Sequence, residues 1–173
     1  MPSVPSDPPA DAPARIPGGP GWSMDPLSLL PVIDDPAEFR RAHAADPALP
    51  LLEELWGGRP ERAEPLAHAL VAASPTARHR ALLADVHRDL GRTARAVAAY
   101  EELVEECRGT PREAVMLQHL GKAHFAARDH AAAARAFAAA LRLRTAAGAD
   151  PALIASSRAA LHRARALLSD PSE

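Results

Sequence analysis

The sequence predicts an all-α fold built from stacked helical hairpins, and three observations lead to this prediction. Ala63, Ala96 and Ala133 recur at spacings of 33 and 37 residues, each inside a stretch of similar pattern. Alanine, the best helix former, is very frequent. Aromatic residues make up only 3% of the chain, and runs of strand-forming residues are missing. Repetition at this period is typical of stacked hairpins, because one hairpin cannot bury its apolar face alone.

The repeated stretches share an apolar helix face. Positions one, four, seven and eight after each alanine suit a buried face, and the copy after Ala63 is the weakest of the three. After Ala96 these residues are Val97, Tyr100, Leu103 and Val104, and after Ala133 they are Ala134, Phe137, Ala140 and Leu141.

The domain boundaries follow from composition. Residues 1–34 are expected to form a disordered, proline-rich tail, because small residues, proline and glycine bury too little apolar surface to offset the cost of ordering. The alternative is a proline-rich ligand for an aromatic groove, for which Ser6-Asp7-Pro8-Pro9 offers little context. Residues 35–170 are expected to form the helical domain, with a degenerate repeat at 44–76, repeats at 77–111 and 114–147, and a capping helix at 150–168.

Local signals mark the helices in order. Asp35 is placed to cap a first helix that has Pro36 at its first position, and Asp46-Pro47 repeats this start signal before an apolar run. Pro60 opens the third helix, which either starts late, near Glu64, or is kinked by Pro65.

Beyond residue 76 the pattern becomes more regular. Helices are predicted at 77–90 and 94–107, at 112–127 and 131–144, and finally from Asp150 onward, with turns at Gly91, Asp129 and Gly148. The last helix carries an apolar stripe made by Ile154, Ser157, Leu161, Ala164 and Leu168.

Segments 77–111 and 114–147 have the same order of residue types. Each has a leucine and a small residue in its first helix, a small residue early in its second helix, and an aromatic residue four positions later. These are Leu83-Ala84, Ala96 and Tyr100 in one segment, and Leu120-Gly121, Ala133 and Phe137 in the next. In this order the segments resemble tetratricopeptide repeats, helix-turn-helix units of about 34 residues. A departure is Arg128, which stands where the repeat has a turn glycine.

The resemblance implies an α-solenoid whose concave groove is lined by the first helices and binds a peptide or protein. The groove residues expected on this basis lie opposite the Leu83 and Leu120 face or beside the apolar stripe of the last helix. They are Asp85, Arg88, Gln118, Lys122, Phe125, Arg158, His162 and Arg165. The alternative for the charged members is solvent exposure with local pairing to Asp85 or Asp89.

Charge distribution bears on the kind of partner. Residues 1–75 have a net charge of −6 and residues 112–168 a net charge of +6. The sequence therefore predicts a non-enzymatic interaction scaffold whose protein or peptide partner is acidic, since arginine binds carboxylates in fork geometry. The alternative is a regulatory helical module whose basic C-terminal half contacts nucleic acid; a clustered basic helix with base-reading residues, which this would need, is missing.

Catalytic, metal and cofactor sites are not expected. The eight histidines lack the spacing of metal ligands, and the sequence has no nucleophile-elbow, P-loop or dinucleotide motif. Cys107 is the single cysteine and falls on an apolar helix face. No run of about 18 apolar residues predicts a membrane span, and a cytoplasmic location is expected.

Overall fold

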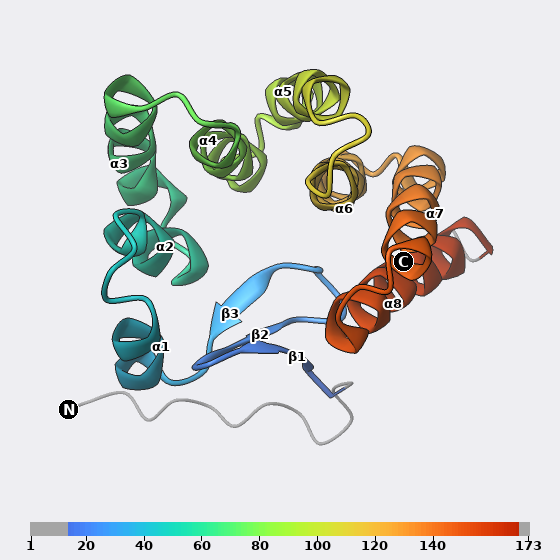
Figure 1. Ribbon diagram of the computed structural model, residues 1–173, viewed down its shortest axis with the longest axis horizontal. Helices are drawn as coiled ribbons and strands as arrows, with labels where there is room; N and C mark the ends of the chain where they lie inside the picture. The colour runs from blue at the N-terminus through green and yellow to red at the C-terminus, as the bar shows by residue number, and fades with distance from the viewer. Residues whose placement is uncertain (1–13, 170–173) are drawn as a thin grey trace.

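The computed structural model describes residues 14–169, which form three short strands followed by eight helices. Figure 1 shows the helices in a curved row, with the strands on its concave side between the two ends. In chain order the elements are β1 (Ile16–Gly19), β2 (Trp22–Met24), β3 (Pro31–Ile33), α1 (Pro36–Ala42), α2 (Leu49–Trp56), α3 (Pro60–Ala73), α4 (Ala77–Asp89), α5 (Thr93–Glu106), α6 (Glu113–Ala126), α7 (His130–Ala146) and α8 (Pro151–Ser169). The predicted, mostly helical fold is thus confirmed.

The helix starts follow the capping signals in the sequence. The Asp35 carboxylate accepts hydrogen bonds from two N–H groups of the first turn of α1. The side chains of Thr76 and Asp129 accept one such bond each at the starts of α4 and α7. Each of these bonds satisfies an N–H group that has no partner inside its helix. The alternative in which the third helix starts near Glu64 is wrong, because α3 begins at Pro60 and continues through Pro65.

The turns inside the helix pairs use a left-handed residue. Gly58 and Gly91 have φ angles of 73° and 74°, which glycine adopts without steric cost. The turn between α6 and α7 places Arg128 in the same region, with φ of 61°. This conformation is unfavourable for a residue with a Cβ atom. The turn at Arg128 therefore uses the same left-handed backbone conformation as the turns at Gly58 and Gly91, although it has no glycine.

A shared core joins consecutive helices, and it confirms the predicted aromatic positions as buried. Helices α2 to α8 pack against one another in chain order, and one cluster of buried residues extends from α4 to α7. Tyr100 and Phe137 have no exposed surface. The Phe137 ring lies so close to Gly121 that a Cβ atom there would come within 2.5 Å of it.

The N-terminal segment differs from the prediction. Residues 16–33 form an antiparallel sheet in the order β1-β2-β3, with Ile16 opposite Met24 and Trp22 opposite Ile33. The expectation of a disordered tail is therefore wrong for this part of residues 1–34, while its first 13 residues lie outside the described part of the chain. These strands are three or four residues long and are interrupted by proline and glycine. They are too short to show a strand period in the sequence.

The sheet is held by apolar contacts with both ends of the helical row. Trp22 and Ile33 pack into the cluster formed by α1, α2, α3 and α4. Met24 and Leu29 are buried in the cluster formed with α7 and α8. The sheet therefore connects the first helices to the last ones across the concave side (Figure 1).

Candidate functional site on the concave side of the helices

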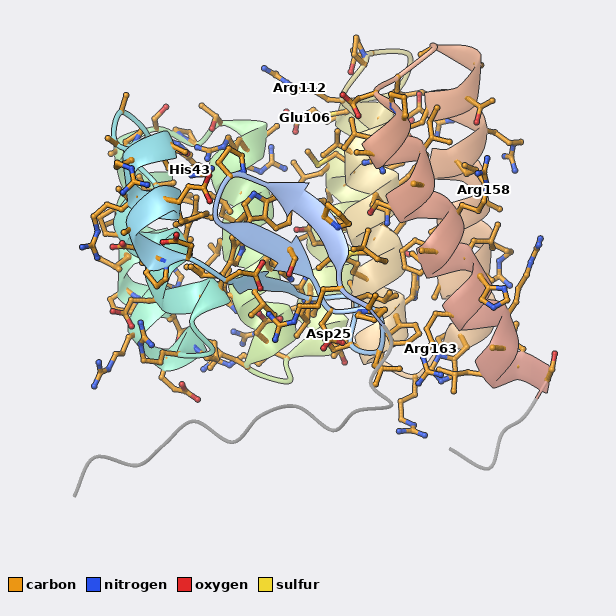
Figure 2. All side chains as sticks on the ribbon, turned by 90° about the horizontal axis from the view of Figure 1, so that it is seen from below. Asp25, His43, Glu106, Arg112, Arg158 and Arg163 are labelled. Carbon is orange, nitrogen blue, oxygen red and sulfur yellow. The ribbon has the colours of Figure 1, made fainter. Side chains whose placement is uncertain are left out.

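The eight predicted groove residues do not form one surface. Asp85, Arg88 and Gln118 are buried, and Lys122 and Phe125 are partly buried. The three residues predicted on α8, namely Arg158, His162 and Arg165, are exposed, and Figure 2 shows Arg158 on the side of α8 that faces away from the sheet. The basic strip expected from Arg88, Lys122, Arg158 and Arg165 is not formed.

The other side of α8 faces the concave space. Ser156 Oγ lies 3.9 Å from Met24 Sδ in β2. Arg163 and Leu167 line an opening of about 410 Å³ together with Lys122 and Phe125. The predicted apolar stripe of α8 is confirmed for Ser157, Leu161 and Ala164, which are buried, but it is wrong for Leu168, which is 50% exposed. The sequence did not indicate which edge of that stripe lies toward the groove.

Asp85 is the centre of a buried polar network on α4. Its Oδ1 atom lies 2.5 Å from an Arg88 guanidinium nitrogen, 2.8 Å from the Tyr100 hydroxyl and 3.3 Å from His119 Nδ1. Burial raises the pKa of Asp85, but the charges of Arg88 and His119 outweigh burial and hold the pKa well below its usual range. Asp85 is therefore an ionised group that fixes the packing of α4, α5 and α6.

Arg88 is neutralised inside the protein. Its Nε atom donates to Asp89 over 2.7 Å, in addition to the bond with Asp85, and only 4% of the residue is exposed. Burial also raises the pKa of Asp89, with the charge of Arg88 opposing this effect. Because the Arg88 guanidinium is already paired with the Asp85 and Asp89 carboxylates, it offers little to an acidic partner.

A second polar chain joins α6 to α7 and α8. The Ser157 hydroxyl donates to Gln118 Oε1 over 2.7 Å, and Arg144 donates to Ser157 Oγ over 2.8 Å and to the Leu153 carbonyl over 2.9 Å. The amide nitrogen of Gln118 is buried without a hydrogen-bond partner. Gln118 and Arg144 therefore have structural roles between helices, and they are covered from solvent.

Lys122 is a predicted groove residue whose pKa is shifted toward neutral pH. Burial lowers its pKa to about 8, and the charge of Arg88 adds to this effect while Asp85 opposes it. The ammonium group is thus easier to deprotonate than that of an exposed lysine.

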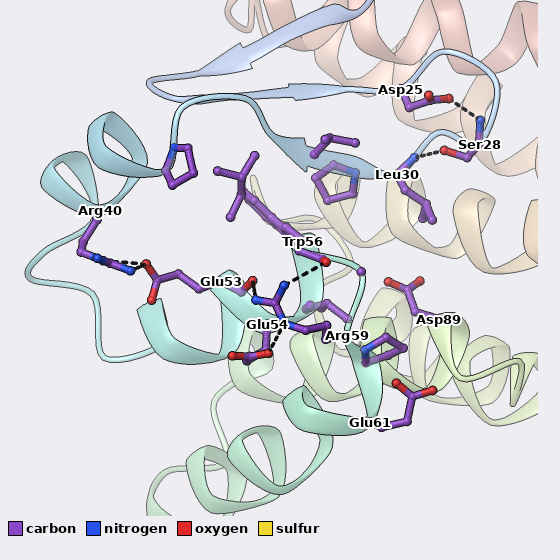
Figure 3. Close-up of a pocket in the computed structure, with 18 residues that line it drawn as sticks. Asp25, Ser28, Leu30, Arg40, Glu53, Glu54, Trp56, Arg59, Glu61 and Asp89 are labelled. Atoms are coloured by element: carbon purple, nitrogen blue, oxygen red, sulfur yellow. Dashed lines mark hydrogen bonds and ion pairs between the residues drawn. The ribbon is translucent and has the colours of Figure 1, made fainter. Parts of the chain in front are cut away.

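An open cleft lies between the sheet and the end of α2 (Figure 3). Its volume is about 900 Å³. The residues that line it come from the β2–β3 loop, β3, α1, α2, the α2–α3 turn, the start of α3 and the end of α4. They are Asp25, Ser28, Leu30, Pro31, Val32, Ile33, Pro36, Arg40, Glu53, Glu54, Leu55, Trp56, Gly57, Gly58, Arg59, Pro60, Glu61 and Asp89. This volume lies within the range of ligand sites in proteins.

The two arginines of this cleft are already paired. Arg40 lies 2.7 Å from Glu53, and Arg59 lies 2.5 Å from Glu54. Arg59 also donates to the carbonyl oxygens of Gly57 and Glu53, each over 3.3 Å. These bonds fix the α2–α3 turn. Asp89 is paired with Arg88, so the carboxylates of the cleft left to a partner are Asp25 and Glu61 (Figure 3).

Asp25 remains ionised at the start of the β2–β3 loop. Its Oδ1 atom accepts hydrogen bonds from the N–H groups of Leu27 and Ser28, both over 2.8 Å. Burial raises its pKa, but these bonds, the Ser28 hydroxyl and the charge of Arg15 together outweigh burial, and the pKa is lowered. Asp25 therefore both shapes the loop and keeps a negative charge at the edge of the cleft.

Sequence reasoning missed this cleft because one of its walls belongs to the segment assigned to the tail. Two short runs, residues 22–24 and 31–33, flank a turn that starts with Asp25-Pro26. An Asp-Pro turn between short apolar runs is a hairpin signal, and it could have suggested the pair of strands β2 and β3.

Comparison of the chain with family models, with curated proteins and with solved structures finds no match. Within residues 14–169, no helix is both long and apolar enough to cross a membrane. In the same range, no three histidine, cysteine, aspartate or glutamate side chains are grouped so that they could hold a metal ion.

Proposed function

We propose that this protein is a non-enzymatic interaction scaffold, a short tetratricopeptide-like solenoid that binds a segment of a partner protein on its concave side. The observation that carries the proposal is the curved row of helices that share a core with their neighbours (Figure 1). Such arrays have extended, shallow surfaces that suit peptides better than small substrates.

Equivalent positions of the proposed repeats have equivalent surroundings. Ala96 and Ala133 are both fully buried, as are the aromatic residues Tyr100 and Phe137 four positions later. Ala63 is also fully buried, which supports α2 and α3 as the degenerate first repeat. We assign α4 with α5 and α6 with α7 as the two regular repeats, and α8 as the capping helix.

The polar groove residues Asp85 and Gln118 are 5% and 3% exposed. They are bonded to side chains of neighbouring helices, Tyr100 of α5 and Ser157 of α8, and so offer little to a partner. The cleft of about 900 Å³ beside β3 stays open. We therefore place the partner in this cleft, and not along the groove faces of α4 and α6.

Site-specific photocrosslinking tests this proposal. A benzophenone amino acid at the exposed cleft residue Glu61 is expected to crosslink a specific protein in the native cell. The same group at Glu101, an exposed residue of α5 outside the cleft, is the matched control and is expected to crosslink no such partner. Crosslinks found at Glu101 alone, or recovery of nucleic acid that is released as salt increases, would contradict the proposal.

A further inference from the structure

The edge of β3 forms one border of the cleft. Successive side chains of a strand point to opposite faces, yet Pro31, Val32 and Ile33 all line the cleft. The cleft therefore meets the edge of the sheet and is not confined to one face. Within the described residues, β3 has β2 as its one neighbour in the sheet, so its second edge is open.

The hydrogen-bond pattern shows which backbone groups point outward. Asp25 N–H donates to the Leu30 carbonyl and Asp34 N–H donates to the Gly21 carbonyl, each over 2.9 Å. In the same register Val32 is opposite Ser23. Bonded and non-bonded pairs alternate in an antiparallel ladder, so the peptide groups of Val32 face β2. The N–H of Ile33 and the carbonyl groups of Pro31 and Ile33 face the other way, toward an added strand.

Charge around this edge favours a cationic occupant. Five carboxylates and two arginines line the cleft, and the arginines are each held by a glutamate of the same cleft. Glu61 is exposed. Asp25 is ionised and accepts hydrogen bonds from its own loop, and the nearby Arg15, whose charge also lowers the pKa of Asp25, is paired with Asp34. A positively charged side chain near either residue would gain electrostatic energy without first breaking an internal ion pair.

Apolar groups complete the cleft. Trp56 is partly buried and packs against Trp22, with ring centroids 4.8 Å apart and the rings tilted by 45°. Pro36 and Pro60 lie in the same lining. The aliphatic stems of lysine and arginine cover such surfaces while their charged ends reach the carboxylates, and a guanidinium group can also stack on an indole ring.

From the open edge of β3 and the acidic, tryptophan-containing cleft beside it, we infer that an extended segment of a partner protein, rich in lysine or arginine, binds here as a fourth strand next to β3. The segment would bond to the outward peptide groups of Pro31 and Ile33. Its cationic side chains would meet Asp25 and Glu61. This inference rests on the proposed scaffold function and names its partner as basic, whereas the sequence suggested an acidic one.

Peptide binding to the full-length protein tests the charge preference. The probe is a fluorescein-labelled heptapeptide of alternating lysine and valine with blocked ends, and the comparison peptide has glutamate in place of lysine. By fluorescence anisotropy, the lysine peptide is expected to bind at least about tenfold more tightly. The Glu61→Lys variant should weaken it about fivefold, whereas Glu101→Lys, with the same change in net charge, should leave it unchanged. Equal binding of both peptides, or equal effects of both variants, overturns the inference.

Amide hydrogen exchange tests strand addition separately. The lysine peptide is expected to slow exchange at the N–H of Ile33 and to leave that of Val32, already bonded to β2, unchanged. A peptide with alternate backbone N-methyl groups should lose binding, because it cannot extend the ladder. Unchanged exchange at Ile33, or full binding of the methylated peptide, overturns the strand-addition geometry. If photocrosslinking at Glu61 captures a protein while one of these negative peptide results is obtained, the proposed scaffold function is retained and the strand-addition inference is rejected.

Discussion

Met24 Sδ lies 3.9 Å from Ser156 Oγ, although the two residues are 132 positions apart in the chain. Two residues before Met24, Trp22 packs against Trp56 of α2. Strand β2 therefore contacts the first helices at one end and the last helix at the other. This connection holds the curved row of helices at a fixed opening and places the open edge of β3 beside the cleft.

Shortening Trp22 should release the sheet from the first helices. We expect Trp22→Ala to lower the free energy of unfolding by about 2–4 kcal/mol, somewhat less than for a fully buried tryptophan, because Trp22 is partly exposed. Urea denaturation followed by circular dichroism measures this change. The control is Leu27→Ala in the β2–β3 loop, where the side chain is 49% exposed and the expected change is below about 0.5 kcal/mol. Equal effects of both variants would show that the sheet contributes little to stability.

Adding one methyl group at Gly121 should destabilise the protein. Alanine normally stabilises a helix by about 1 kcal/mol relative to glycine. At this position, however, the Cβ atom would lie 2.5 Å from the Phe137 ring. We expect Gly121→Ala to cost about 1–3 kcal/mol, as measured by thermal or chemical unfolding. The double variant with Phe137→Leu should recover part of this loss, and a stabilising effect of the single change would be inconsistent with the packing of α6 on α7.

The strained turn at Arg128 offers a stabilising change. Its φ angle of 61° is unfavourable for a residue with a Cβ atom, so Arg128→Gly is expected to raise the free energy of unfolding by about 1 kcal/mol. The reverse change, Gly91→Arg in the equivalent turn, should lower it by a similar amount. If both variants lowered stability, the side chain of Arg128 would matter more than its backbone conformation.

Removing the Asp85 carboxylate should be costly. Asp85→Ala leaves Arg88 with Asp89 as its remaining partner and removes one of the two acceptors near the Tyr100 hydroxyl. Loss of one member of a buried ion pair costs about 3–5 kcal/mol. By contrast, Asp34→Ala, which breaks the exposed pair with Arg15, should cost less than about 1 kcal/mol. Chemical denaturation of the two variants compares them directly, and similar losses would refute a central role for Asp85.

Lys122 should make stability rise with pH in the alkaline range. Its pKa is about 8 in the folded protein and near 10.4 in the unfolded chain, so between these values the unfolded state binds more protons. The free energy of unfolding should therefore increase between pH 8 and 9.5, by up to about 1.4 kcal/mol per pH unit. Lys122→Met should be more stable than the parent at pH 7 and should lack this increase. Parallel pH curves for the two proteins would contradict the lowered pKa.

The sequence by itself determined the helices and the way they pair. Alanine-rich helices, their caps and their turn glycines are local signals, which is why the start of α1 at Asp35 and the turns at Gly58 and Gly91 could be predicted. The buried state of Tyr100 and Phe137 also followed from the sequence, because the spacing of apolar residues fixes which face of a helix packs on its neighbour.

Only the tertiary structure decided what occupies the concave side. Strands β1 to β3 depend on contacts with α2 and α8, far along the chain, and such contacts have no local signature. The orientation of α8 was also decided by packing. Both edges of its apolar stripe carry polar residues, and in the fold the edge with Ser156 faces the sheet while Arg158 on the other edge is exposed. The charge of a partner depends on which side chains remain unpaired after folding, and ion pairs such as Arg88 with Asp85 and Asp89 form only when the helices bring those groups together.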